Sequence, residues 1–367
     1  MTGRDSDGPI MVVLGTRPEI VKLAHITRIL GDDGVVVHTG QHYDPGLSDS
    51  FFELLYLPEP EVSLEIGGES RGRQIGLAVT ALDGLFAEKR PAAVVVQGDT
   101  NTVLAAALAA NAREIPVVHV EAGLRSRDRR MPEEHNRVVT DHLADLLLAP
   151  TETSRSNLLA EGIPDERIVV TGNTVVEAVR ELMPNPDERQ ALVESFGVTS
   201  GRFVLSTFHR PENVDDADTL AAILAQLAAL PYPVLLPLHP RAVARVADAG
   251  LGNLLDRLTV VEPIGYREFL GLGAESAFVV SDSGGVQEEV SVYKRPILVV
   301  RRSTERPEVI GTFAERVEPG PDITRIAAGW AADLEAVHAR LAETPSPYGD
   351  GSASQRSVDA IKELINA

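Results

Sequence analysis

The chain has 367 residues, of which 44% are hydrophobic and 24% charged, a composition typical of folded globular domains and not of disordered or fibrous proteins. Its 34 basic and 54 acidic residues give a formal net charge of −20 at pH 7, which disfavours nucleic acids and anionic membrane surfaces as partners. The sequence contains no cysteine, which excludes disulfides, thiolate metal sites and a cysteine nucleophile.

Short apolar segments rich in Val, Ile and Leu recur along the chain, and each is followed by a segment with helical periodicity, the pattern of parallel β-α units. In the first half we expect strands at residues 10–15, 35–40, 93–98, 117–121, 146–149 and 168–172. The second half repeats the pattern at residues 203–207, 234–238, 258–262, 278–282 and 297–300. The sequence therefore predicts an α/β protein with two doubly wound parallel sheets.

A turn-rich stretch, Met183-Pro184-Asn185-Pro186-Asp187, separates the two series of strands, because helix is disfavoured before proline. A final helix is expected over residues 353–365. We expect an N-terminal domain of residues 1–172 plus 352–367 and a C-terminal domain of residues 173–351. Ligands of such sheets bind beyond the carboxyl ends of the strands, so polar residues at strand ends are candidate site residues.

The first expected strand runs into Gly-Thr-Arg-Pro-Glu and a helix, which places Arg17 and Lys22 near a helix N-terminus. There the helix dipole favours an anion, although a capped helix with solvated charges explains the same pattern. Asp99 follows a fully apolar strand, at a position that suits either a helix cap or a site residue.

The next strand ends at Glu121, which is expected at the same rim as Asp99, and Glu133 opens a helix that begins with proline. Capping explains an acid at a helix start equally well. Three carboxylates at one crevice would repel one another unless cations neutralise them. Such a group suits proton transfer.

In the second half, His209 and Arg210 follow a strand and precede a helix, in a loop expected to face the cleft between the domains. A later strand runs through Ser283, Gly284 and Gly285 into a helix that carries Glu289. Small residues there let backbone N–H groups approach a phosphate at the helix N-terminus, and the carboxylate can accept from sugar hydroxyls. This segment indicates a nucleotide site.

Other ligand classes gain no support from the sequence. The nine histidines are scattered without a metal-ligand spacing, and no GxGxxG, P-loop or GxSxG motif occurs. We therefore expect no metal site. The N-terminus is polar and acidic and no apolar run reaches membrane-spanning length, so we expect a cytoplasmic protein.

An ordered set of motifs spans residues 11–310: GTRPEIVK, TGQHY, QGDTNT, HVEAGLRS, MPEEHNR, TGNTVVEA, HRPENV, SDSGGVQEE and TERPE. Together they resemble the non-hydrolysing UDP-N-acetylglucosamine 2-epimerases. The resemblance implies a GT-B fold, in which two Rossmann-like domains face a central cleft, and it implies a homodimer. It also implies anti elimination of UDP to a 2-acetamidoglucal, followed by re-addition with inversion at C2, without a cofactor.

By motif position, the resemblance makes Asp99, Glu121 and Glu133 the catalytic acids of the first domain. It assigns His209 to the departure of UDP. The residues that it implies for binding the UDP-sugar are Arg17, Lys22, Arg137, Arg210, Ser283, Gly284, Gly285 and, on the ribose, Glu289. Gln41 and His42 are candidate regulatory residues. The resemblance places the catalytic acids in the N-terminal domain and UDP binding in the C-terminal domain.

Four other functions fit the same motifs. The enzyme can act on a different UDP-sugar, such as a diacetamido uronic acid or a non-acetylated hexose, or it can hydrolyse the intermediate and release N-acetylmannosamine and UDP. The fold also serves glycosyltransferases and non-catalytic sugar-nucleotide binders. Three strand-end acids argue against pure binding of an anionic ligand. Deuterium from solvent at C2 would separate the eliminating enzymes from the transferase and the binder.

Overall fold

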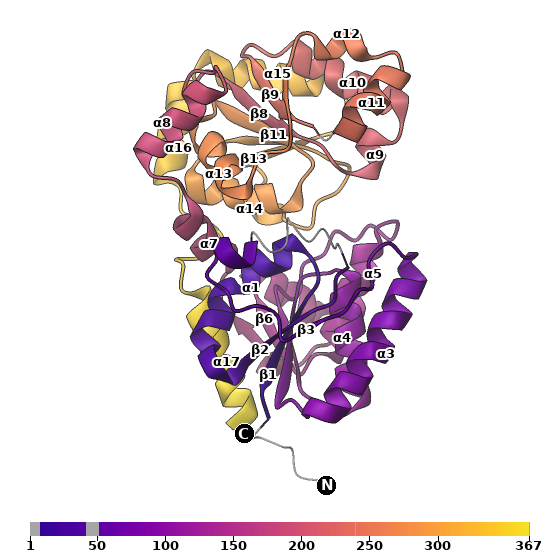
Figure 1. Cartoon of the computed structure of the whole chain (residues 1–367). Coiled ribbons are helices and arrows are strands. Elements are labelled where there is room, and N and C mark those ends of the chain that lie inside the picture. The colour runs from indigo at the N-terminus through magenta and orange to yellow at the C-terminus, as the bar shows by residue number, and fades with distance from the viewer. Residues whose placement is uncertain (1–7, 42–50, 239, 367) are drawn as a thin grey trace. The chain divides into compact units, whose positions relative to one another are not determined.

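The computed structural model describes residues 8–41, 51–238 and 240–366, and the structural statements below refer to these residues. The chain forms two compact units, one of residues 1–178 with 348–367 and one of residues 179–347. Each unit contains a parallel sheet with helices on both of its faces (Figure 1).

The sheet of the first unit has seven strands in the order β3-β2-β1-β4-β5-β6-β7. They are β1 (Ile10–Leu14), β2 (Gly34–His38), β3 (Val62–Ser63), β4 (Ala93–Gln97), β5 (Val117–Val120), β6 (Leu146–Ala149) and β7 (Ile168–Val170). The helices are α1 (Arg17–Leu30), α3 (Arg71–Lys89), α4 (Asn101–Ala112), α5 (Pro132–Leu143), α6 (Glu152–Ala160) and α17 (Ala353–Asn366), with 3-10 turns at Gly31–Asp33 and Asp165–Arg167. Helix α7 (Val175–Leu182) begins in this unit and ends in the second. Helix α17, from the end of the chain, packs beside α1 (Figure 1).

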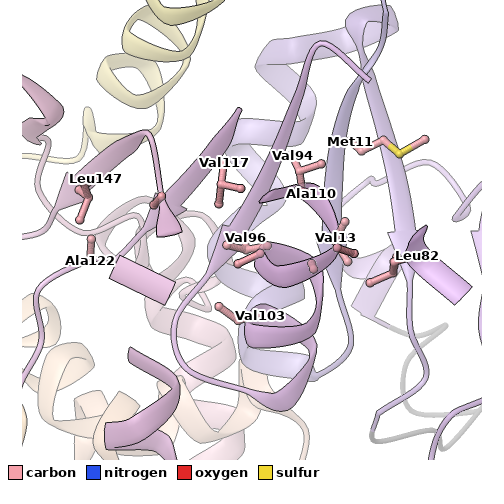
Figure 2. Close-up of a cluster of buried hydrophobic side chains, with 14 of the residues drawn as sticks. Met11, Val13, Leu82, Val94, Val96, Val103, Ala110, Val117, Ala122 and Leu147 are labelled. Atoms are coloured by element: carbon pink, nitrogen blue, oxygen red, sulfur yellow. The ribbon is translucent and has the colours of Figure 1, made fainter. Parts of the chain in front are cut away.

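The core of this unit follows from strands that are apolar on both faces. Met11 and Val13 of β1 lie on one face with Val94 and Val96 of β4, where they meet Leu82 of α3 (Figure 2). Each such side chain contributes roughly 1.5–3 kcal/mol when it is fully buried. Buried alanines of α4 join the same cluster, and their small size lets the helix lie close to the sheet.

The sheet of the second unit has six strands in the order β10-β9-β8-β11-β12-β13. They are β8 (Val204–Thr207), β9 (Val234–Pro237), β10 (Thr259–Val261), β11 (Phe278–Ser281), β12 (Ile297–Val300) and β13 (Ala314–Val317). The helices are α8 (Pro186–Ser195), α9 (Pro211–Val214), α10 (Ala217–Ala228), α11 (Pro240–Asp248), α12 (Gly252–Leu255), α13 (Tyr266–Glu275), α14 (Gly284–Tyr293), α15 (Asp322–Ala332) and α16 (Leu334–Glu343), with a 3-10 turn at Pro307–Val309.

The strand order of each sheet reverses at one place, between β1 and β4 in the first unit and between β8 and β11 in the second. The loops that follow the strands at such a switch point leave in opposite directions and open a crevice for ligands. The sequence motifs lie at these loops: Arg17 follows β1, Asp99 follows β4, His209 follows β8 and Ser283 follows β11. The topology thus gives each unit one site.

The predicted class, two doubly wound parallel sheets, is confirmed. Two strands were not predicted. Strand β3 has only two residues, and β13 is an edge strand whose two central residues, Glu315 and Arg316, are exposed, so neither forms the continuous apolar run of a central strand. Within the described part of the chain, no helix is both long enough and apolar enough to cross a membrane.

Candidate active site

Helix α1 brings two cations to the switch point of the first sheet. Arg17 occupies the first position of the helix and its side chain is exposed. Lys22 lies more than one turn further on, is buried, and forms an ion pair with the carboxylate of Glu121. The structure therefore pairs Lys22 with a catalytic candidate, whereas the sequence assigned it to the substrate.

Glu121 follows β5 directly and has a left-handed backbone, with φ of +68°. Its Oε2 accepts hydrogen bonds from Gln97 Nε2 and Asn173 Nδ2, each at 3.2 Å, in addition to the Lys22 contact. A buried carboxylate needs such compensation, because removal of a charge from water costs several kcal/mol. The backbone conformation and these three donors fix where the carboxylate lies.

Asp99 is held by Arg137 of α5. Its Oδ2 lies 2.9 Å from Arg137 Nε and 2.6 Å from Nη2, and 29% of its side chain is exposed. On its other side, Arg137 contacts Glu134 Oε2 at 2.6 Å. The two cations Lys22 and Arg137 thus neutralise two of the acids, as the predicted group of carboxylates requires.

The adjacent acids Glu133 and Glu134 have different surroundings. Glu134 is buried and also accepts from the backbone N–H groups of Ser126 and Arg127, at 2.9 and 2.8 Å. Glu133 is half-buried, and its carboxylate makes no hydrogen bond or ion pair to any residue that the structure describes. Of the pair, Glu133 is the carboxylate that is open to a ligand.

The sequence did not single out Glu19, although it is a fully buried acid in the same region. Its carboxylate accepts from Gly15 N–H at 3.0 Å, Thr16 Oγ1 at 2.8 Å and Thr100 Oγ1 at 2.9 Å. Burial raises its pKa from 4.5 to about 7, against the lowering effect of these hydrogen bonds. Through its hydrogen bonds, Glu19 joins the loop after β1 to the residue that precedes α4.

Gln41 is buried, and its Oε1 accepts from the backbone N–H of Thr102 at 2.8 Å and from Thr102 Oγ1 at 3.0 Å. Its side chain thus ties the loop after β2 to α4. His42, the other candidate regulatory residue, lies outside the described residues. A regulatory role for this pair stays a prediction.

In the second unit, the buried carboxylate of Asp282 organises the loop that carries His209 and Arg210. It accepts from the backbone N–H groups of His209 (3.1 Å) and Arg210 (3.0 Å) and from Asn213 Nδ2 (3.0 Å), and it lies 3.0 Å from His209 Nδ1. Burial opposes ionisation, but these contacts, led by His209, outweigh it and lower the pKa of Asp282. The His209 side chain is 60% exposed, so the imidazole is oriented from one side and open on the other.

Helix α14 begins directly after Ser283, which occupies the cap position and makes no side-chain cap hydrogen bond. A Cβ on Gly284 would lie 2.8 Å from Arg306 Nη1 and 2.9 Å from Glu305 Oε1, whereas one on Gly285 would have no neighbour closer than 3.7 Å. The first N–H groups of a helix lack intrahelical partners, and small residues leave them accessible. Glu289, one turn further on, is buried and accepts from Tyr266 Oη at 3.0 Å.

Among the side chains placed in the structure, no group of His, Asp and Glu is arranged to hold a metal ion. The two sites are built from carboxylates held by cations in the first unit and from a histidine, an arginine and a helix start in the second. The first arrangement suits proton transfer and the second suits a phosphate.

A family model described as UDP-N-acetylglucosamine 2-epimerase matches residues 31–362 of the chain. The chain belongs to this family. A UDP-N-acetylglucosamine 2-epimerase of Methanocaldococcus jannaschii is 38% identical over 361 residues, which cover 95% of this chain and 97% of that protein. The membership predicted from the motifs is confirmed.

Two further comparisons concern the fold and the sugar substrate. The crystal structure of the M. jannaschii UDP-GlcNAc 2-epimerase in complex with UDP-GlcNAc and UDP matches with a TM-score of 0.84 at 37% identity, over 97% of this chain and 99% of that one. A UDP-2,3-diacetamido-2,3-dideoxy-D-glucuronate 2-epimerase of Pseudomonas aeruginosa is 33% identical over 97% of this chain and 99% of that protein. The GT-B fold class is confirmed, and the family includes epimerases of more than one sugar.

Proposed function

We propose that this protein interconverts UDP-N-acetylglucosamine and UDP-N-acetylmannosamine. The observation that carries the proposal is the pair of carboxylates after β4 and β5, Asp99 and Glu121, each held by a buried cation. Binding of an anionic sugar nucleotide gains nothing from extra negative charge, whereas proton transfer at carbon needs an acid and a base.

In the proposed reaction, a carboxylate takes the proton from C2 while the bond between C1 and the diphosphate oxygen breaks. The electron pair of the C2–H bond forms the C1–C2 double bond of a 2-acetamidoglucal, and UDP leaves with the electrons of the C–O bond. Re-addition of UDP to C1 with protonation of C2 on the opposite face gives the epimer. We propose that Asp99, Glu121 and Glu133 share these proton transfers.

The second unit is proposed to bind UDP. The N-terminus of α14 at Ser283, Gly284 and Gly285 offers N–H donors for the diphosphate, and developing negative charge on a leaving group is stabilised by donors that are already in place. His209 and Arg210 add positive charge from the neighbouring loop. Arg17 and Arg137 are proposed to add further positive charge from the first unit, and Glu289 to accept from the ribose.

The relative from P. aeruginosa supports one alternative, a 2-epimerase of a UDP-diacetamido uronic acid. That reaction uses the same elimination at C2 and C1, so the proposed residue roles do not depend on the sugar. A hydrolysing variant, in which water captures the glucal, is the second alternative. A homodimer and a cytoplasmic location also stay proposals.

Proton NMR of the purified protein with UDP-N-acetylglucosamine in deuterium oxide tests the proposal. We expect deuterium at C2 in both UDP-sugars and an equilibrium mixture of the two epimers. Free N-acetylmannosamine with UDP would favour the hydrolysing enzyme. No deuterium at C2, although UDP binds, would contradict the proposed substrate, and the diacetamido uronic acid derivative would be assayed next in the same way.

A further inference from the structure

His119 is a fully buried histidine of β5 to which neither the proposed mechanism nor the motif assignments give a role. Its ring nitrogens contact two different segments of the first unit. Nδ1 lies 2.6 Å from Asp141 Oδ1 on α5, and Nε2 lies 2.8 Å from the carbonyl oxygen of Gly98, the first residue after β4.

Both ring nitrogens of His119 face oxygen atoms that can accept a hydrogen bond. A carbonyl oxygen can only accept, so Nε2 carries a hydrogen. Asp141 Oδ1 is the acceptor that faces Nδ1, and Oδ2 of the same carboxylate lies 2.7 Å from Arg125 Nη1. The cluster is closed by Glu161, which lies 2.6 Å from Arg125 Nη2. Arg125 thus bridges the carboxylates of Asp141 and Glu161.

The contacts of Asp141 bracket Glu121 in the chain. The carboxylate of Asp141 contacts His119 Nδ1, two residues before Glu121. It also accepts a hydrogen bond, at 3.2 Å, from the backbone N–H of Gly123, two residues after Glu121. Glu121 itself has a left-handed backbone, a conformation that a non-glycine residue keeps only where its surroundings enforce it. Asp141 thus anchors both ends of the strained turn.

The same helix anchors Asp99 at three points, one of which is the hydrogen bond from Asn136 Nδ2 to the carbonyl oxygen of Asp99 itself, at 2.8 Å. Its side chain is held by Arg137, and the carbonyl of the preceding residue, Gly98, is held by His119, which is in turn bound to Asp141. Arg137 and Asp141 are four residues apart on α5 and therefore lie on one face. Helix α5 thus holds both the side chain and the backbone of Asp99 in place.

We propose that His119 is a positioning residue: through Asp141 it fixes the backbone that carries Asp99 and Glu121 on α5, without contacting substrate itself. The inference rests on the proposed function of those two carboxylates. Displacement of a catalytic group by about 1 Å can lower a rate by about a hundred-fold, which sets the size of the effect to be sought.

Two substitutions separate the contacts of His119. In His119→Asn the amide reaches about as far as Nδ1, so it keeps the contact with Asp141 and loses that with Gly98. In His119→Gln the amide reaches about as far as Nε2 and keeps the contact with Gly98. We expect kcat for deuterium incorporation at C2 to fall about a hundred-fold in both variants, because each breaks one of the two links between Gly98 and Asp141, with KM and UDP affinity little changed.

A matched control is His142→Asn in the last turn of α5, where the exposed imidazole contacts Val138 O of its own helix, at 2.8 Å. Its kcat should equal that of the wild-type protein. A wild-type kcat in either His119 variant would overturn the positioning role. If the wild-type protein incorporates no deuterium, the proposed function fails first, which is a different result.

Nitrogen-15 NMR of histidine-labelled wild-type protein tests the hydrogen-bond arrangement without any variant. We expect a directly bonded hydrogen on each ring nitrogen of His119. The signals of this residue are assigned because they disappear in His119→Gln. If that variant does not fold, they are assigned by the slow exchange of their hydrogens with solvent. A ring nitrogen of His119 without hydrogen would overturn the proposal, because one of the two anchors would then be missing.

Discussion

At the scale of single residues, the candidate acids differ in how their charge is compensated. Glu121 and Asp99 are each paired with a buried cation, whereas Glu133 is half-buried and makes no such contact within the described parts of the chain. A buried ion pair is strongly destabilised when one partner is removed, because the other charge remains in a low-dielectric surrounding. A substitution of Glu121 is therefore expected to change both the turnover and the stability of the protein, because it leaves Lys22 without its counter-charge.

Glu121→Gln should lower turnover by roughly 10²- to 10⁴-fold, the usual range for loss of a general acid or base. It should also lower the free energy of unfolding by about 3–5 kcal/mol, because Lys22 loses its counter-charge. UDP affinity should remain, since the proposed UDP contacts of α14 lie in the other unit. Steady-state kinetics, UDP titration and urea unfolding measure the three quantities.

The double variant Lys22→Met with Glu121→Gln is the control for that experiment. Replacement of both members of a buried pair by neutral groups of similar size is often close to neutral for stability. We expect the double variant to regain most of the lost stability and none of the lost turnover. Recovery of turnover together with stability would show that Glu121 has only a structural role.

At the scale of elements, the start of α14 depends on the absence of a side chain at Gly284. Arg306 and Glu305, which a Cβ there would touch, are buried and locked by ion pairs with Glu288 and Arg301. We expect Gly284→Ala to destabilise the second unit by about 1–3 kcal/mol, the usual cost of overpacking, and to weaken UDP binding. Urea unfolding and UDP titration test this.

Gly285→Ala is the matched control for stability in that experiment, since its Cβ would meet only Glu289 Oε1, at 3.7 Å. Alanine is also the better helix former, so no loss of stability is expected. Equal losses in the two alanine variants would mean that the cost comes from the helix backbone and not from Arg306 and Glu305.

Central strands were predictable because each is a continuous apolar run that ends in a turn residue, and the site loops follow from the strand ends. The pairing of charges was not predictable. Lys22 meets Glu121 across 99 sequence positions, and the sequence contains nothing that distinguishes this contact from a contact with substrate. Glu134 and Glu133 are adjacent acids with opposite surroundings, which only the orientation of α5 decides.

The roles of Asp282, Asp141 and Glu19 were missed for a similar reason. Asp282 was placed at a strand end, but its four contacts come from a loop about 70 residues earlier in the chain. One signal was present: an acid at the carboxyl end of a buried strand, beside the switch point, must be compensated by nearby donors if it is itself buried. That rule would have identified Asp282 as a candidate site residue, although it would not have identified its hydrogen-bond partners.

At the scale of the whole molecule, the buried carboxyls make stability depend on pH in two opposite ways. Asp141 and Asp282 have lowered pKa values in the folded state, so their contribution is present above their ordinary value of 3.8 and is lost as the pH falls through the lowered values. Glu19 has a raised pKa, and its contribution has the reverse dependence.

Glu19 binds its proton more tightly in the folded than in the unfolded chain, because burial raises its pKa from 4.5 to about 7. Its contribution is therefore complete below pH 4.5 and is lost as the pH rises to about 7, on the order of 3 kcal/mol in all. Glu19→Gln keeps the three hydrogen bonds if its oxygen takes the Gly15 and Thr16 donors and its amide donates to Thr100, but it does not titrate. We expect urea unfolding to show the wild-type free energy of unfolding falling relative to the variant over this range. A constant difference between the two proteins from pH 4.5 to pH 7 would mean that Glu19 is ionised throughout in the folded state, compensated by those three donors.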